Sequence, residues 1–288
     1  MQDIFKKLVI ATSIPVLVLF FTLVMQIDLP GKSLLHCLLI TFALHWSLGL
    51  PSILLKTERL YDISGMLAVL AMLLFIVITV GVNSSRSQLL LGICCMWTLR
   101  LGLFLFIRVL KHKHDSRFDA LKESPLSFLI AWNLSAVWTF LTTMVVLVAM
   151  LGNHQQPLAA IDMVPLSGWF LAFIVEIVAD YQKYNFKNKY GSNNFIQTGL
   201  WQYCRHPNYS AEILMWVMVA VLALPNLQYW GCLSLLSPVF VTFFLTKISG
   251  VNILEQRNDN RYGDMLAYKN YKKNTPALMP KLSLIFNK

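Results

Sequence analysis

Eight long apolar runs restrict this chain to a membrane-spanning fold. A hydrocarbon core about 30 Å thick needs roughly 20 apolar residues in a helix. The sequence therefore predicts an all-α, polytopic membrane helix bundle of about eight transmembrane helices, within a range of seven to nine. The runs cover about residues 8–27, 34–55, 64–82, 88–110, 126–151, 166–181, 211–227 and 230–250.

The basic residues are distributed unevenly between the connecting segments of this bundle. If the N-terminus is cytoplasmic, 19 of the 24 Lys and Arg residues fall in cytoplasmic segments, and only Lys32 and Arg86 fall in segments on the other side. Cytoplasmic loops of membrane proteins carry such an excess. The net charge of +10 thus reflects topology, and we expect no nucleic-acid partner. The predicted protein is multi-pass, with both termini cytoplasmic, in a bacterial inner membrane or the endoplasmic reticulum.

We expect a single membrane domain over residues 1–288. Its first run follows two lysines but has no small-residue cleavage site after it, so we interpret it as an anchor rather than a signal peptide. Residues 1–165 form the N-terminal helices, and 166–288 form a C-terminal part with a cytoplasmic loop at 181–210 and a polar tail at 251–288. The five cysteines show no metal-ligand spacing, so neither a metal site nor a disulfide framework is expected.

Several ionisable residues fall inside the predicted spans, where charges are costly and commonly mark functional sites. Glu176 and Asp180 are four residues apart, and Lys183 follows three residues later, so all three share one helix face. This spacing predicts the wall of a polar cavity. The other such residues are Arg100, Arg108, Glu212 and Lys247.

The stretch GLWQYCRHPNYSAE, residues 199–212, combines polar groups with the start of the seventh run. Pro207 suits the first turn of a helix, because its missing N–H would have no partner there. Asn208 and Glu212 then lie on one face, next to Arg205 and the free N–H groups of the helix start, which favour anions. We expect Arg205 to hold a phosphate and the pair below it to hold a neutral polar group such as a carboxamide. His206 is expected to cap or pack.

The tail interleaves aromatic and basic residues, with Tyr262, Tyr268 and Tyr271 among Arg257, Arg261, Lys269, Lys272 and Lys273. This spacing suits a purine ring with its phosphates. It equally suits a juxtamembrane segment on anionic lipid head groups. The composition leaves both interpretations open.

Three stretches together resemble the steroid 5-alpha-reductase superfamily, and in particular a branch of multi-pass membrane proteins within it. They are DYQKYNF at 180–186, GLWQYCRHPNYSAE, and the tail pattern from Glu255 to Pro280. The resemblance begins near residue 60 and implies an NADPH-dependent reductase that saturates a C=C bond in a lipid-like substrate entering from the bilayer. It implies that Asp180, Asn208 and Glu212 hold the nicotinamide half, and that Arg205, Arg257, Arg261, Tyr268 and Tyr271 hold the phosphates and adenosine. Lys183, His206 and Tyr209 are predicted to be cofactor-binding residues as well.

The predicted catalytic residues depart from the family pattern. Arg100 resembles an arginine of the substrate cavity, but Trp97 stands where the steroid reductases have a tyrosine three residues earlier. An indole cannot donate a proton to an enolate as a phenol can. Tyr61 or Asp62 is therefore expected to take that role, unless the substrate is not an enone.

Two other functions are compatible with the sequence. Membrane methyltransferases that use S-adenosylmethionine share R-H-P-x-Y and a similar tail. They lack the D-x-Q-K box, which Asp180, Gln182 and Lys183 form in this chain, and they carry paired glutamates where this chain has Glu255 and Gln256. A lipid-binding protein of the same fold without catalytic activity is the second alternative.

Overall fold

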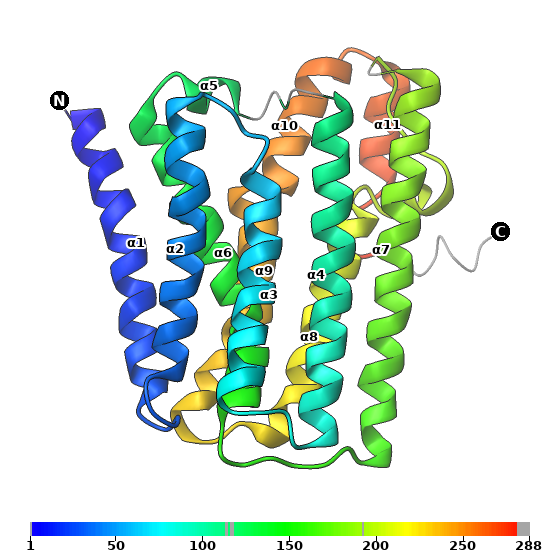
Figure 1. The fold of residues 1–288 in the computed structure, drawn as a ribbon. Coiled ribbons are helices and arrows are strands. Elements are labelled where there is room, and N and C mark those ends of the chain that lie inside the picture. Colours follow the sequence, from blue (N-terminus) through cyan, green and yellow to red (C-terminus); the bar gives the residue numbers. More distant parts are fainter. Residues whose placement is uncertain (1, 113–114, 116–117, 192, 281–288) are drawn as a thin grey trace. The chain divides into compact units, whose positions relative to one another are not determined.

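The computed structural model describes residues 2–112, 115, 118–191 and 193–280 (Figure 1). All regular elements in this part of the chain are helices, which confirms the all-α membrane bundle. Lys113, Arg117, Lys281 and Lys288, which the topology prediction counts as cytoplasmic, lie outside the described residues.

Seven helices among the described residues are long and apolar enough to cross a membrane, which lies within the predicted range. They are Ser33–Leu54, Tyr61–Thr79, Ser85–Lys111, Pro125–Leu151, Ala160–Tyr190, Pro207–Asn226 and Tyr229–Tyr262. The first predicted run lies in α1 (Gln2–Gln26), of which Thr12–Gln26 is a shorter apolar helix.

The chain divides into two compact units. Unit 1 comprises Met1–Ala159 and Leu222–Ser237, and unit 2 comprises Ala160–Val221 and Pro238–Lys288.

Unit 1 is built around a helix that is apolar on all sides. This helix, α6 (Pro125–Leu151), packs against α1, α2 (Ser33–Leu54), α3 (Tyr61–Thr79) and α4 (Ser85–His112). Figure 1 shows α1, α2 and α3 side by side, as their mutual contacts require. A helix without a polar face is expected at the centre of a bundle, and 78% of its apolar window is buried. The short elements α5 (Asp119–Lys122), η3 (Leu224–Asn226) and η4 (Tyr229–Leu236) complete the unit.

Small residues bring the helices of unit 1 close together. A side chain at Gly49 of α2 would lie 2.7 Å from the ring of Trp132 on α6, and one at Gly102 of α4 would lie 2.6 Å from Met66 on α3. Such close backbone contacts are how membrane helices gain packing energy, since burial in lipid adds little.

Unit 2 contains the two predicted polar segments. It consists of η1 (Ala160–Asp162), α7 (Met163–Tyr190), η2 (Gly199–Gln202), α8 (Pro207–Ala223), α9 (Ser237–Phe243), the π-helical η5 (Phe244–Ile248), α10 (Val251–Tyr262) and α11 (Leu266–Asn274). The helices α7 and α8 are in contact, because a side chain at Gly168 would lie 2.8 Å from the sulfur of Met218.

Two boundaries in unit 2 differ from the sequence prediction. The predicted loop at 181–210 is helical as far as Tyr190, because no glycine or proline interrupts α7 after Gly168 and Lys187 and Lys189 favour its C-terminal end. The helix ends at Gly191, whose φ of 72° and ψ of −172° form a backbone conformation that suits glycine. The last predicted span, 230–250, is not one α-helix but a 3₁₀, α and π series. Pro207 begins α8, as predicted.

Candidate functional site

The first half of the 199–212 stretch is held against α7 by the D-x-Q-K box. The backbone N–H of Leu200 donates to the Gln182 side-chain oxygen at 3.0 Å, and the Trp201 indole donates to the Ala179 carbonyl at 3.1 Å. The Lys183 ammonium lies 4.9 Å from the centre of the Trp201 ring. Trp201 is buried. The two motifs thus form one structural element, in which Gln182 and Trp201 join helix and loop.

Gly199 allows the loop to approach Gln182 closely. Its φ is +64°, and an added Cβ would lie 2.5 Å from the Gln182 side-chain oxygen. We expect Gly199→Ala to lower the free energy of unfolding by about 2–3 kcal/mol, from left-handed strain and a displaced hydrogen bond. The matched control is Gly31→Ala, which has a similar φ of +57° but open space and should lose only about 1 kcal/mol. Thermal unfolding in detergent measures both, and equal losses would contradict the contact.

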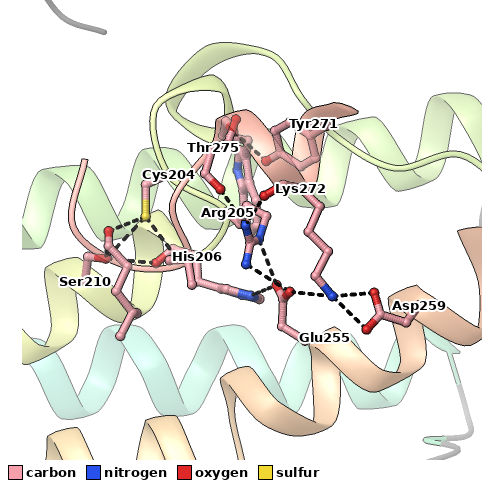
Figure 2. A network of polar contacts seen from close by, with 12 residues as sticks. Cys204, Arg205, His206, Ser210, Glu255, Asp259, Tyr271, Lys272 and Thr275 are labelled. Atoms are coloured by element: carbon pink, nitrogen blue, oxygen red, sulfur yellow. Dashed lines mark hydrogen bonds and ion pairs between the residues drawn. The ribbon is translucent and has the colours of Figure 1, made fainter. Parts of the chain in front are cut away.

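Arg205 joins the start of α8 to the tail (Figure 2). Its Nε and Nη2 each donate to the Glu255 carboxylate at 3.1 Å, and its Nη1 donates to the carbonyls of Lys272 and Thr275 at 2.8 and 2.5 Å. A guanidinium has five N–H donors, so four of them are used by the protein. Arg205 therefore has a structural role in addition to any contact with a phosphate.

His206 shares the same carboxylate. Its Nε2 lies 2.8 Å from Glu255 and its ring stacks on Tyr209, with centroids 5.8 Å apart. Burial, reinforced by the nearby Lys183 and Arg205 charges, lowers the pKa of His206, although the hydrogen bond to Glu255 opposes this shift. The neutral ring then donates from Nε2, and its buried Nδ1 is an acceptor without a protein partner in the described part of the chain.

This environment predicts a pH dependence of stability. Because the pKa of His206 is lowered on folding, the unfolded chain binds a proton near pH 6.5 that the folded chain does not. The stability is therefore complete above that pH and is lost as the pH falls below it. We expect the thermal unfolding midpoint to decrease as the pH is lowered from 7.5 to 5.5. The decrease should be smaller in His206→Gln, which has no titrating group at this position. Identical pH profiles for both proteins would contradict a neutral His206.

The residues after α11 run along the start of α8. The backbone N–H groups of Arg205 and His206 donate to the carbonyls of Pro276 and Ala277 at 2.9 and 3.0 Å. The thiol of Cys204 and the hydroxyl of Ser210 both donate to the carbonyl of Leu278 (Figure 2). Backbone and side-chain hydrogen bonds from residues 204–210 thus join the motif to residues 276–278 of the tail.

The tail tyrosines pack on one another and on the loop after α7. The ring of Phe195 lies within 5.7 Å of the rings of Tyr262, Tyr268 and Tyr271. The Tyr271 hydroxyl donates to the Trp201 carbonyl at 2.6 Å, and that of Tyr268 donates to Asp259 at 3.2 Å. Burial raises the pKa of both Tyr268 and Tyr271, so they are neutral donors. These contacts give the predicted adenosine-side tyrosines a packing role.

A group of acceptors lies on α7 and the first turns of α8. The Asn208 amide donates from Nδ2 to the Asp180 carboxylate at 3.2 Å, which leaves its buried Oδ1 without a partner in the described chain. This contact also fixes the orientation of the amide, since the opposite one would place two oxygens together. Glu176 and Glu212 are both buried. The predicted polar wall of Glu176, Asp180 and Lys183 thus carries two carboxylates on α7, and Asn208 and Glu212 add further acceptors on α8.

The remaining predicted cations of unit 2 lie on the surface of α10 and α11. Arg257, Arg261, Lys269 and Lys273 are exposed. A shallow pocket of about 440 Å³ is lined by Lys269, Lys272 and Lys273 together with Asp259, Gly263 and Tyr268. Lys272 is paired with Asp259 at 2.6 Å. The basic side chains around this pocket provide positive charge for a phosphate.

The predicted catalytic residues lie in unit 1 and contact other residues of that unit. Tyr61 donates its hydroxyl to the Ala131 carbonyl at 2.9 Å and packs against Phe118 and Trp132. Asp62 lies 4.0 Å from Arg108. The guanidinium of Arg100 lies 5.6 Å from the Phe104 ring centre, and Trp97 is buried. The hydrogen bond of Tyr61 and the ion pair of Asp62 hold these two side chains in place. The catalytic role of Tyr61, Asp62 and Arg100 stays a prediction.

Two residues central to this arrangement were absent from the predicted site. Gln182 was known only as a letter of the D-x-Q-K box, and Glu255 only as part of the tail pattern. Their partners are 18 residues away or more. The available signal was the presence of an acidic residue, Glu255, at the start of a basic tail segment that also contains Asp259 and Asp264.

Comparison with known proteins gives matches to proteins of unknown function. The family model described as Protein of unknown function (DUF1295) matches residues 50–275. An uncharacterized protein of Schizosaccharomyces pombe is 27% identical over 116 residues, which cover 33% of this chain and 34% of that protein. The match thus spans about a third of that relative's length. No solved structure matches. Because the family model covers most of the sequence, from before α3 to the end of α11, the chain belongs to the DUF1295 family.

Proposed function

We propose that this protein is an NADPH-dependent membrane reductase of the steroid 5-alpha-reductase superfamily, which saturates a C=C bond in a lipid-like substrate. The D-x-Q-K box and the R-H-P-N-Y motif carry the resemblance to that superfamily. The Asn208 side chain of the second motif donates to the Asp180 carboxylate of the first within unit 2, as in parts of one site.

The observation that carries the proposal is the buried side-chain oxygen of Asn208, which lacks a hydrogen-bond donor among the described residues. Its Oδ1 is buried and lacks a protein partner in the described residues, while its Nδ2 is fixed by Asp180. A buried acceptor without a donor costs about 1–3 kcal/mol. A ligand that donates a hydrogen bond at this position would recover that cost, and the carboxamide of a nicotinamide ring has two such N–H groups.

The rest of the unit suits the same cofactor. Glu212 lies one helical turn after Asn208 and is buried, so it is a second acceptor on that face. The exposed side chains of Arg257, Arg261, Lys269 and Lys273 offer four cations to the phosphates. This donor and acceptor set matches a molecule with one amide end and one polyanionic end.

Bound NADPH would supply the hydride, and the protein would supply its orientation. Asn208 and Asp180 would hold the carboxamide and so set the plane of the ring. Arg205, His206 and Glu255 would act as positioning residues, since they fix the start of α8 to the tail. The long apolar helices suit a substrate that enters from lipid.

Ligand titration distinguishes this proposal from the two alternatives. The full chain in detergent is titrated with NADPH and, separately, with S-adenosylmethionine, and the unfolding midpoint is followed. We expect NADPH to raise the midpoint and S-adenosylmethionine to leave it unchanged. Stabilisation by S-adenosylmethionine alone would replace the reductase by a methyltransferase. If neither ligand stabilised the chain, the non-catalytic alternative would take its place.

A further inference from the structure

One face of α7 carries an exposed apolar stripe. Phe170, Leu171, Ile174, Ile177 and Val178 are all more than a third exposed, with Leu171 at 63%. Exposed apolar side chains on a transmembrane helix face lipid tails. The stripe ends at Tyr181, which is also 63% exposed. Tyrosine is enriched where a helix leaves the hydrocarbon core, so this residue marks the head-group level of α7.

A pocket of about 340 Å³ begins at Tyr181, on the part of α7 that was predicted to be a loop. The positions along the helix, 174, 178, 181, 185 and 189, follow one another at intervals of three or four residues. The pocket therefore continues the face that carries the stripe. Its opposite wall is formed by Ile196, Thr198 and Gly199.

The lining combines aromatic and aliphatic side chains with several hydrogen-bonding groups and one positive charge. Asn185 and Thr198 have no side-chain hydrogen bond within the described chain, and Gln182 uses only its oxygen, for Leu200. Lys189 places its ammonium 5.1 Å from the centre of the Tyr190 ring. The lining contains no Asp or Glu. One cation with several hydrogen-bonding groups matches a single phosphodiester joined to hydroxyl groups.

The position of Lys189 argues against a choline or ethanolamine head group. An aromatic ring can hold an ammonium ligand, but the Tyr190 ring is already next to the lysine charge, which repels a second cation. An anionic head group gains from the same charge.

We infer that this pocket binds the head group of an anionic glycerophospholipid with one phosphodiester and hydroxyl groups, whose acyl chains lie along the α7 stripe. This site is separate from the proposed cofactor residues, since none of its lining residues is among them. The lipid would hold the C-terminal end of α7 at the membrane surface.

The test uses the full chain after delipidation in detergent. Dioleoyl phosphatidylglycerol or dioleoyl phosphatidylcholine is added, and native mass spectrometry counts the bound lipids while the unfolding midpoint is followed. We expect phosphatidylglycerol to be retained and to raise the midpoint. Lys189→Ala and Asn185→Ala should each weaken its binding about fivefold. The control is Lys187→Ala, an exposed neighbour outside the pocket, which should bind as the unchanged protein does.

Three results would overturn this inference. They are equal binding of the two lipids, no effect of either pocket variant, and displacement of the lipid by glycerol 1-phosphate as effectively as by phosphatidylglycerol itself. The last would identify the ligand as a soluble phosphate. NADPH affinity measured on the same variants should stay unchanged, and its loss in Lys189→Ala would assign the pocket to the nucleotide instead.

Discussion

Replacement of Glu255 by glutamine is expected to lower the free energy of unfolding by about 3 kcal/mol. The Glu255 side chain is only 14% exposed, and its carboxylate accepts from Arg205 at 3.1 Å and from His206 at 2.8 Å, with Lys272 at 3.5 Å. Glutamine keeps the shape but removes the negative charge and turns one acceptor into a donor. The Arg205 guanidinium would then be left in a partly buried site without its counter-ion.

Thermal and denaturant unfolding of the full chain in detergent measure this effect. The matched control is Asp264→Asn, which removes an exposed carboxylate at the turn after α10 that has no ion pair with the described residues. Its midpoint should stay that of the unchanged protein. If E255Q were as stable as D264N, the network in Figure 2 would not hold the tail.

Replacement of Asn208 by alanine is expected to weaken NADPH binding about 10- to 100-fold. The change removes the buried Oδ1 that we assign to the carboxamide, and the loss of such a bond costs about 1–3 kcal/mol. The stability of the free protein should change by only about 1 kcal/mol, since Asn208 contributes one side-chain hydrogen bond within the described residues, at 3.2 Å to Asp180. Binding and folding are thus affected to different degrees.

Equilibrium titration of NADPH with the purified chain checks this prediction. Asn188→Ala on α7 is the control, because Asn188 is exposed and lies outside the network. It should bind NADPH with unchanged affinity. Equal affinities of N208A and N188A would remove Asn208 from the site.

The membrane fold could be predicted because the length and hydropathy of each apolar run can be read from neighbouring residues alone. The α6 span, for example, was placed within one residue of its observed start, since Ser124 and Pro125 are local start signals. The end of α7 could not be placed from hydropathy, which falls at Asp180 although the helix continues to Tyr190. A polar segment can stay helical when its side chains bind a neighbouring loop, as Gln182 and Lys183 do.

The sequence predicted which residues belong to the candidate site better than it predicted which of them contact one another. The i, i+4 spacing placed Asn208 and Glu212 together, and the missing N–H of Pro207 located the helix start. The role of Arg205 could not be derived in the same way, because Glu255 is 50 residues away and its approach depends on how α10 packs. A sequence motif records which residues are needed, whereas the tertiary contacts decide whether each one binds a ligand or holds the protein together.

The two halves of the cofactor provide the most direct test of the proposed site. Binding of reduced nicotinamide mononucleotide and of 2′,5′-ADP is measured separately by equilibrium dialysis on the full chain and on Asn208→Ala. We expect the variant to lose the nicotinamide fragment and to retain 2′,5′-ADP, because in the proposed site the acceptors of α7 and α8 would contact only the carboxamide end. Unchanged binding of the nicotinamide fragment by Asn208→Ala would contradict the account.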